Sequence, residues 1–573
     1  MSTLEKAHRT TLPETGGIAL KIQLKKEFRG TFEVLDVREG TTIEDLYRSI
    51  EAQLPYRILA ARVNNKFEAL SYRIKKECKI ELLDIRTQAA SLVYQNSLCL
   101  IYLRAIEEVL GPVEVDIENA INQGLYTEIK MQPAVTSKDV RNIQKVMERI
   151  VKDNLPFVRH EYTVAEASEF LIKHGERHKL QLLSENGEER KIPFYSLDGY
   201  IDFFYGLMVP SAGYIEYFQV MKYKRGVLLR FPQPADPKVI PPYEDEKVLY
   251  KTFGEQNQWG KLMGINYVSD LNKKIEDGQF KELIQLSEAL HEKKIVEIAD
   301  TITRQKKRII LIAGPSSSGK TTFAHRLCIQ LRVNGLQPLY MGTDDYFVER
   351  ENTPLDEYGE KNYENLSALD IHLFNQNMNN LLSGKTVDLP TFDFLTGKKT
   401  YGKRITQIKG NQPIVIEGIH ALNEALTCEI PREEKFKIYI SPLTQLNIDN
   451  HNRVVTTDHR MLRRMVRDFK YRGYSAQNTI ASWPKVREGE NKNIFPFSNE
   501  ADAMFNSVHL YEICVLKKYA EPLLKKITPQ EPEYGDAQRM LNFLRFFKTV
   551  KDDSAIVNNS ILREFIGGSV FSD

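Results

Sequence analysis

The chain has few cysteines, almost no net charge and no long apolar run, and each absence narrows what it can be. Its five cysteines in 573 residues show no paired CxxC spacing, which argues against a zinc framework or a disulfide scaffold and favours a reducing compartment. Lys and Arg number 79 and Asp and Glu 77, so a net charge of +2 gives no global field for nucleic acid or an anionic membrane. No run approaches the roughly 18 apolar residues of a membrane span, and the first residues lack a signal-peptide core. We therefore expect a cytoplasmic protein with no membrane partner.

The length and composition indicate a multidomain globular protein. A chain of 573 residues holds about three to four domains, and 42% hydrophobic residues lets each bury a core of its own. The proline-rich run from Pro232 to Pro242 cannot form a regular helix or a central strand, so it reads as a linker. We divide the chain into residues 1–87, 88–232, 233–305 and 306–573.

The first of these segments alternates short strand patterns around one helix. The helix is opened by Thr42, with Ile43, Leu46 and Ile50 at helical spacing. The order is ββαββ, which is consistent with a β-grasp fold. The expected strands are Ile18–Leu24, Phe32–Val37, Ile58–Val63 and Lys79–Ile85. The second segment is mixed α+β and includes a polar helix from Ser137 to Val151.

The strongest motif in the chain is Gly-Pro-Ser-Ser-Ser-Gly-Lys-Thr at residues 314–321, directly after the apolar strand Ile309–Ala313. Its two glycines allow a tight turn whose backbone N–H groups converge, and a following helix adds its positive end. Phe323, Leu327 and Leu331 lie on one face of that helix. The motif predicts a triphosphate cradle for ATP with Mg²⁺, although a Gly/Ser turn that binds nothing is the plain alternative.

Further strand patterns alternate with helical ones and predict a doubly wound, mostly parallel sheet. The strands are Pro338–Met341, Ile414–Ile416 and Phe436–Ile440, and a helical pattern at Leu283–Ile302 precedes the phosphate loop. Acidic residues follow two of these strands, where open α/β sheets bind ligands. We expect Asp344 to be the catalytic base and Glu417 to hold the metal through water.

The most basic tract runs from Arg460 to Arg472. On a helix its arginines at positions 460, 463, 464 and 467 share one face. Such a face is usually solvated or paired with acids. Beside a phosphate loop, however, guanidinium groups suit phosphate oxygens, and we expect a lid over the phosphates. RNA binding by this tract is less favoured, because it lacks interleaved aromatics.

These residues together resemble the uridine kinase and phosphoribulokinase family of P-loop kinases, over about residues 306 to 510. Thr343-Asp344-Asp345-Tyr346-Phe347 resembles the family motif that carries the catalytic base, and residues 363–370 resemble its ribose-binding segment. The resemblance implies transfer of a phosphoryl group from ATP to the 5′-hydroxyl of a nucleoside. The implied catalytic residues are Asp344, Lys320, Arg464 and Arg467. The implied nucleotide site is Gly314, Pro315, Ser316, Ser317, Ser318, Gly319, Lys320, Thr321, Thr322 and Arg472; the substrate site is Asp344, Tyr346, Glu364, Phe392, Asp393 and Arg464; and the metal site is Thr321 and Glu417.

The sequence departs from the family where the acceptor is read. The family's Tyr-Asp-Phe-x-x-His-x-Arg segment is here Phe392-Asp393-Phe394-Leu395-Thr396-Gly397-Lys398-Lys399, without the phenol and the imidazole. Glu364 stands in place of the ribose-binding Asp. Lost hydrogen bonds of this kind strongly weaken discrimination. Uridine is therefore the acceptor only by analogy with the family. Another nucleoside or a small alcohol stays an open alternative.

The front of the chain resembles two other modules. Residues 18–85 are similar to a TGS domain, and 88–232 to the second additional, editing-type domain of threonyl-tRNA synthetases. That family's zinc ligands fall on Gln95, Cys99, Phe204 and Met208, of which only Cys99 is a strong zinc ligand. We therefore expect no aminoacyl-tRNA editing.

Two alternatives to a nucleoside kinase stay open. An ATP-sensing regulatory protein could bind RNA through its synthetase-like half, and a homo-oligomer is compatible with either function. A GTPase is less favoured, since no Asn-Lys-x-Asp guanine motif follows the phosphate loop. The histidines at 325, 372, 420, 451 and 459 have no metal spacing and are expected to be structural or exposed.

Overall fold

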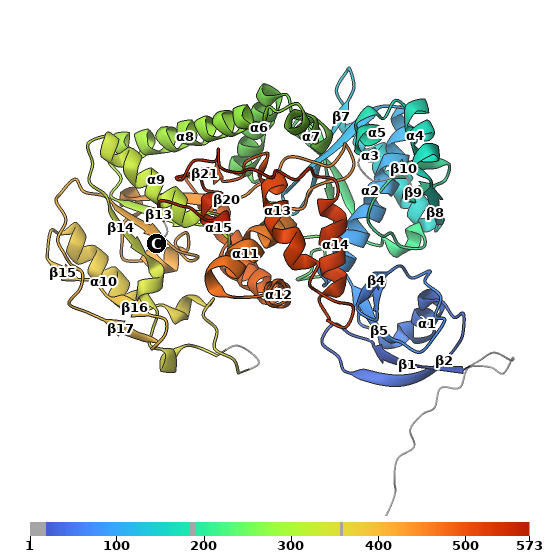
Figure 1. Cartoon of the computed structure of the whole chain (residues 1–573), viewed down its shortest axis with the longest axis horizontal. Helices are drawn as coiled ribbons and strands as arrows, with labels where there is room; N and C mark the ends of the chain where they lie inside the picture. The colour runs from blue at the N-terminus through green and yellow to red at the C-terminus, as the bar shows by residue number, and fades with distance from the viewer. Residues whose placement is uncertain (1–18, 184–190, 356–358, 572–573) are drawn as a thin grey trace, which may run out of the picture.

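The computed structural model describes residues 19–183, 191–355 and 359–571. A parallel sheet with its helices lies at one end of the molecule, and the two N-terminal modules lie at the other (Figure 1). Helix α8 (Phe280–Arg304) runs along one side between the two ends, as the Leu283–Ile302 pattern predicted.

The first module is a five-stranded sheet in the order β2-β1-β5-β3-β4 with one helix. Strands β1 and β5 pair in parallel and the other neighbours are antiparallel. Thr42 caps the helix in a reciprocal box with Asp45, because the hydroxyl and the carboxylate each accept an orphan N–H group. The predicted β-grasp order is confirmed, with one short additional strand, β4. The elements are β1 Ala19–Lys25, β2 Phe32–Arg38, α1 Ile43–Ile50, β3 Ile58–Val63, β4 Lys66–Glu68 and β5 Lys79–Asp84.

The second module packs a long, largely buried helix, α2, against two small sheets, β10-β9-β8 and β11-β12-β7-β6. The polar helix expected from residue 137 is α3, again with a capping box. The helices are α2 Gln88–Leu110, α3 Ser137–Lys152, α4 Val164–Lys173 and α5 Arg177–Leu183. The strands are β6 Glu114–Ile121, β7 Gly124–Lys130, β8 Phe157–Tyr162, β9 Ile192–Leu197, β10 Tyr200–Phe203, β11 Gln219–Tyr223 and β12 Gly226–Arg230.

The C-terminal sheet has five parallel strands in the order β14-β19-β13-β20-β21. Its central strand β13 is completely buried, because helices cover both faces of a doubly wound sheet. The predicted fold class is thus confirmed, and the proline-rich linker before α6 contains no helix or strand. The sheet is β13 Ile309–Ala313, β14 Leu339–Gly342, β19 Ile414–Glu417, β20 Lys435–Ser441 and β21 Ala503–Asn506. Two small hairpins pair β15 Val387–Asp388 with β18 Ile405–Thr406 and β16 Thr391–Asp393 with β17 Lys398–Thr400.

Helices connect and cover this sheet. Helices α6 and α7 precede α8, and α15 lies close to the end of the chain. The helices are α6 Lys247–Met263, α7 Val268–Glu276, α9 Lys320–Val333, α10 Ile371–Leu382, α11 Thr456–Arg472, α12 Ala476–Asn493, α13 Glu512–Leu524, α14 Tyr534–Leu544 and α15 Arg563–Ile566.

The apolar cores do not follow the proposed domain boundaries. One core joins Ile22 of the first module to Phe231 at the end of the second. Another joins Phe194 and Phe203 of the second module to Met461 of α11. The expectation that each domain buries a core of its own is therefore wrong for these modules, and the boundaries at 87, 232 and 305 stay a proposal.

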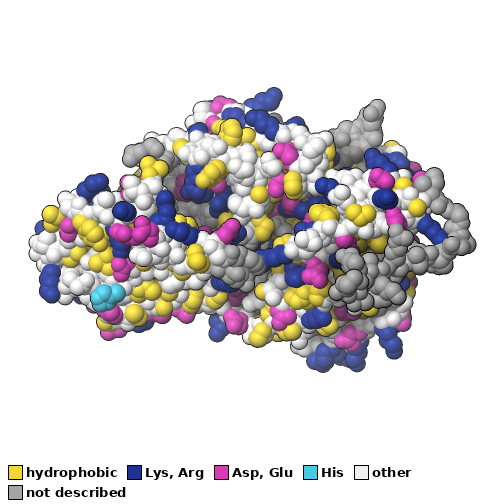
Figure 2. Space-filling model, turned by 90° about the horizontal axis from the view of Figure 1, so that it is seen from below, with side chains coloured by type: hydrophobic (Ala, Val, Ile, Leu, Met, Phe, Trp, Pro, Cys, Tyr) yellow, Lys and Arg dark blue, Asp and Glu magenta, His cyan; other side chains and the backbone are white. Residues whose placement is uncertain are grey.

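The surface agrees with the small net charge. On the face seen in Figure 2, basic and acidic side chains are interspersed without a large field of one sign. Among the described residues, no helix is long and apolar enough to cross a membrane.

Candidate active site

The phosphate loop leaves β13 at the centre of the sheet and opens α9, as predicted. Gly314 is required where the chain leaves the strand, because a Cβ there would collide with the carbonyl oxygen of Ile440 on β20. Gly319 has φ +84°, a left-handed conformation that strains other residues. Two glycines thus permit the close approach and the turn that aim the loop's N–H groups at one point.

Lys320 lies over this loop. Its ammonium donates to the carbonyl oxygen of Gly314 at 2.9 Å. Burial lowers the pKa of Lys320, while the carboxylates of Glu417, Glu564 and Asp344 act in the opposite direction. The structure therefore gathers acidic groups from three separate segments around one ammonium.

Thr321 and Glu417, the two residues expected to hold the metal, are hydrogen-bonded to each other. The Thr321 hydroxyl donates to Glu417 Oε1 at 3.0 Å, and the Tyr340 phenol donates to the same oxygen at 2.7 Å. Burial raises the pKa of Glu417, which Lys320 counteracts. A hydroxyl and a carboxylate are the oxygen donors that Mg²⁺ prefers, so this donor set fits the ion.

The two neighbouring aspartates after β14 differ in their partners. Asp345 accepts from Arg404 Nη1 at 2.5 Å, whereas the Asp344 carboxylate accepts no hydrogen bond from the residues that the structure describes. Asp344 keeps contact with solvent, yet the protein around it raises its pKa by desolvation; Lys320 and Arg472 act to lower it. An unpaired carboxylate with a raised pKa suits a general base.

Three arginines of α11 converge on one acid that the sequence analysis missed. Asp468 lies 3.2 Å from Arg464 Nε, 3.0 Å from Arg467 Nη2 and 3.4 Å from Arg472 Nη1. Arg464 also donates from Nη1 to the hydroxyl of Ser316 in the phosphate loop, at 2.8 Å. The i,i+4 spacing of Asp468 from both Arg464 and Arg472 is the sequence signal that could have revealed this contact.

The expected basic face of α11 is not a single lid. Arg460 and Arg463 are almost fully buried, and each pairs with a buried carboxylate, Glu490 and Glu512 respectively. Burial without a partner would be costly for a guanidinium, so both residues hold the helix in place rather than cover phosphates. Arg464, Arg467 and Arg472 remain at the site.

Glu364 and Glu490 extend the site from other segments. Glu490 accepts from the Ser316 amide at 3.0 Å and from Arg487 at 3.1 Å. Burial and Glu490 raise the pKa of Glu364, whereas Lys320 and Arg464 oppose this shift. Lys320 of the phosphate loop and Arg464 thus act electrostatically on Glu364, whose role at the substrate site stays a prediction. Glu490 had no sequence signal, since its partner lies 174 positions away.

Two expected substrate residues, Tyr346 and Asp393, have their polar groups engaged by the fold. Tyr346 is fully buried and its hydroxyl accepts from Asn377 at 3.2 Å, so its phenol belongs to the core. Asp393 accepts from the amides of Leu395 and Thr396 and so shapes the β16–β17 turn. Phe392 is 7% exposed. Those assignments were wrong for the Tyr346 and Asp393 side chains, because both groups are satisfied by the fold itself.

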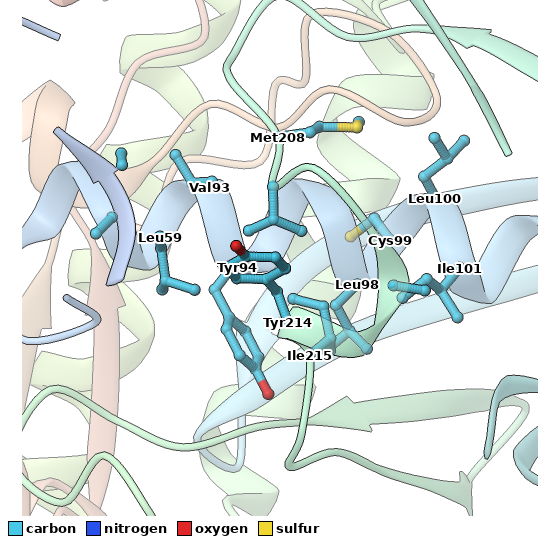
Figure 3. Packing of buried hydrophobic residues seen from close by; sticks show 14 of the residues in the cluster. Leu59, Val93, Tyr94, Leu98, Cys99, Leu100, Ile101, Met208, Tyr214 and Ile215 are labelled. Carbon is cyan, nitrogen blue, oxygen red and sulfur yellow. The ribbon is translucent and has the colours of Figure 1, made fainter. Parts of the chain in front are cut away.

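Three of the four positions that would hold zinc in the second module, Cys99, Phe204 and Met208, belong to an apolar core. Cys99 and Met208 lie among Leu98, Leu100 and Ile101 in Figure 3. Burial raises the pKa of the Cys99 thiol to about 12, which disfavours the thiolate that binds zinc. No group of three metal-ligating side chains occurs in the described part of the chain.

Comparisons with known families assign two regions. Residues 309–513 match the model of the Phosphoribulokinase / Uridine kinase family. Residues 32–84 match the TGS domain. The first match contains the phosphate loop, Asp344, Glu417 and the three site arginines, but not α14 or α15.

The N-terminal part is similar to threonine–tRNA ligases. The protein from Bacillus velezensis is 29% identical over 188 residues, which cover 33% of this chain and 29% of the relative. Threonine–tRNA ligase 1 of Bacillus subtilis gives the same identity and the same coverage. The chain thus spans less than a third of the length of these relatives.

Among solved structures, one described as a possible uridine kinase from Bacillus stearothermophilus is 21% identical and covers 37% of this chain and 98% of its own, with a TM-score of 0.26. A D-glycerate 3-kinase from Cryptococcus neoformans is 13% identical and covers 44% of this chain and 87% of its own, with a TM-score of 0.21. The chain therefore joins a region of the phosphoribulokinase and uridine kinase family to a TGS domain and a threonine–tRNA ligase-like region.

Proposed function

We propose that this chain is an ATP-dependent kinase that phosphorylates a hydroxyl of a small acceptor, with the 5′-hydroxyl of a nucleoside as the leading candidate. The observation that carries the proposal is the unpaired Asp344 carboxylate, which interacts electrostatically with Lys320 of the phosphate loop. Phosphoryl transfer requires mainly positioning, charge neutralisation and a group that takes the acceptor proton. The family match over residues 309–513 supports the same chemistry.

In this proposal, Asp344 accepts the proton of the acceptor hydroxyl. Lys320 and the loop amides hold the phosphates, and Arg464 and Arg467 stabilise charge on the transferring group. Thr321 and Glu417 would hold Mg²⁺, which neutralises phosphate charge when it is bound. Asp468 orients the arginines, because its carboxylate contacts all three of them.

In this proposal, a cluster of three phenylalanine rings borders the site of the acceptor. The rings of Phe347, Phe392 and Phe394 lie with centroids 5.2 to 6.2 Å apart, and Phe394 is 60% exposed. A ring face accepts a planar base by stacking without choosing among bases. Because the hydrogen-bonding groups of the uridine-type motif are missing, we propose a nucleoside acceptor of relaxed base preference ahead of a sugar or small alcohol.

The test is an incubation of the full chain with Mg²⁺, ATP and separate nucleosides, sugars and small alcohols, with products identified by mass. A nucleoside monophosphate supports the proposal, and a phosphorylated sugar or alcohol corrects the acceptor. The Asp344→Asn variant is the control, since it should bind ATP without forming product. Tight ATP binding with no product from any acceptor contradicts the kinase and favours a regulatory ATP site.

The similarity to threonine–tRNA ligases also supports a second candidate, RNA binding by the N-terminal half. Phosphate contacts by lysine and arginine make such binding steeply salt-dependent. We would measure tRNA binding to the full chain at about 50 and 200 mM salt. Affinity that is absent at the lower salt concentration contradicts this candidate and leaves the kinase proposal unaffected.

A further inference from the structure

The loop of residues 442–455, which connects β20 to α11, lies against the second module. The Ile117 amide of β6 donates to the carbonyl oxygen of Asn450 at 2.8 Å, and Asn447 Nδ2 donates to the Ile117 carbonyl at 3.0 Å. Arg453 Nε donates to the carbonyl oxygen of Glu118 at 2.9 Å. Strand β6 is an edge strand whose pairing register shifts after Ile117. The loop therefore satisfies backbone groups that the strand pairing leaves open.

A buried charge cluster fastens the same loop. Lys179 Nζ donates to Asp202 Oδ1 at 2.6 Å and lies 3.1 Å from His451 Nδ1, which also contacts Asp202. All three side chains are at most 7% exposed. Burial alone would raise the pKa of Asp202, but Lys179 and His451 hold it below its usual range. Removing one partner of such a cluster leaves an uncompensated buried charge.

The loop has a defined shape between these contacts. Asp449 accepts from the amides of His451 and Asn452, both at 2.8 Å. Asn452 Nδ2 donates to the Phe203 carbonyl at 3.0 Å, at the end of β10. The loop thus contacts the end of the strand that leads directly into Phe204, a position on which a zinc ligand of the synthetase family falls.

The first turn of α11 is held from two further elements. Asp458 accepts from Gln88 Nε2 of α2 at 2.8 Å and from Arg539 Nη2 of α14 at 2.9 Å. Asp458 is only 2% exposed, so its carboxylate depends on these two partners in place of water. Both hydrogen bonds form only when α11 lies in this position. The second module therefore contacts α11 both through the loop and at its first turn.

The same helix then reaches the phosphate loop. Arg460 Nε donates to the Ser316 carbonyl at 3.1 Å, and Arg464 Nη1 donates to the Ser316 hydroxyl at 2.8 Å. A helix is a stiff element, so a shift at its first turn moves the guanidiniums one and two turns further along. The contacts form one continuous path from Asp202 and Gln88 to Ser316 of the phosphate loop.

We propose that the second module sets the position of α11 and that Asp202 and Gln88 are positioning residues for phosphoryl transfer. This inference rests on the proposed kinase function. It assigns the synthetase-like module a task within this chain: it holds the arginine helix over the phosphate loop instead of presenting an open cleft to an acylated RNA end.

The test compares Gln88→Ala and Asp202→Asn with the control Asp198→Asn. The control makes the same chemical change as Asp202→Asn, in the same module, but at an exposed turn. Misplacing arginines that act on the phosphates should lower kcat by about 10- to 100-fold and weaken Mg·ATP binding, with the KM of the acceptor unchanged. The control should stay within about twofold of the parent. Unchanged kcat and ATP affinity in a folded Gln88→Ala protein would overturn the proposal.

A double-variant cycle separates positioning from general damage. If Gln88 acts through α11, Gln88→Ala should cause little further loss in an Arg464→Gln background. Losses that multiply in the double variant contradict this route. Gln88→Ala carries the test if Asp202→Asn fails to fold. If the parent binds ATP but phosphorylates no acceptor, the proposed function fails, whereas calorimetric Mg·ATP affinity still decides the positioning role.

Discussion

At the scale of single residues, hydrogen bonding separates two carboxylates that are neighbours in the chain. Asp345 is paired with Arg404. Asp344 faces Lys320 and Arg472 at longer range, and its raised pKa results chiefly from desolvation. A carboxylate already engaged by a guanidinium is a poor proton acceptor, so the local partners favour Asp344 as the base.

Replacement of Asp344 should therefore differ from replacement of Asp345. We expect Asp344→Asn to lower kcat by at least about 100-fold, because general base catalysis is removed, with Mg·ATP affinity kept. Asp345→Asn should retain most of kcat. Steady-state kinetics and calorimetry on both variants check this, and the reverse ranking would move the base to Asp345.

Removal of the loop lysine should affect both binding and turnover. Lys320 contacts the phosphate loop and lies within reach of Asp344 and Glu417. Lys320→Ala should weaken ATP binding and lower kcat together, since the ammonium acts on the phosphates in both the ground and the transition state. Retained kcat at saturating ATP contradicts that role.

The acid limb of the pH profile should report Asp344. The base is active when ionised, so kcat/KM falls as the pH drops through its pKa. Arg472 lowers this pKa and Asp345 raises it. Arg472→Gln should therefore move the acid limb to higher pH, and Asp345→Asn should move it to lower pH. If the acid limbs of both variants coincide with the acid limb of the parent protein, another group is responsible for the titration.

At the scale of elements, the inner face of helix α11 is built from buried ion pairs. Arg463 and Glu512 are fully buried, and His459 Nε2 lies 3.1 Å from the same carboxylate. Burial would raise the pKa of Glu512, but Arg463 and His459 hold it below its usual range. The position of the site arginines on this helix depends on that inner face.

Removal of the buried guanidinium should destabilise the whole C-terminal region. Arg463→Leu leaves Glu512 without its main partner, and we expect a loss of about 3–5 kcal/mol in unfolding free energy. The stabilisation from Glu512 is present above its unfolded pKa and lost as the pH falls, so the variant should also show a shallower acid dependence. Urea unfolding followed by tryptophan fluorescence measures both. The exposed Arg332→Leu serves as control, and equal midpoints for the two variants would contradict the prediction.

At the scale of the whole molecule, shared cores and the docked loop join the synthetase-like module to the kinase region. The second core contains residues of both, and edge strand β6 is covered by the loop of residues 442–455. An exposed edge strand is a template for pairing with another chain. The N-terminal modules therefore depend on the C-terminal region for part of their burial.

A fragment of residues 1–246 should self-associate, because it exposes β6 and the apolar side chains that pack on α11. We expect light scattering on a sizing column to show oligomers for this fragment and a 1:1 complex when a fragment of residues 247–573 is added. If the fragment of residues 1–246 is monomeric and does not bind the fragment of residues 247–573, the modules fold independently.

The sequence by itself determined the features encoded locally. The phosphate loop, the strand and helix periods, the Thr42 cap and the ββαββ order each depend on residues a few positions apart, and the structure has them within three residues of the predicted bounds. The tertiary structure decided which charges are buried and paired. Arg460 pairs with Glu490 instead of forming part of a lid, and the Tyr346 hydroxyl bonds Asn377 in the core. Glu490 also contacts the phosphate loop at Ser316. In each case the partner comes from a distant segment. Pairing at such separation is set by packing, which no local pattern reports.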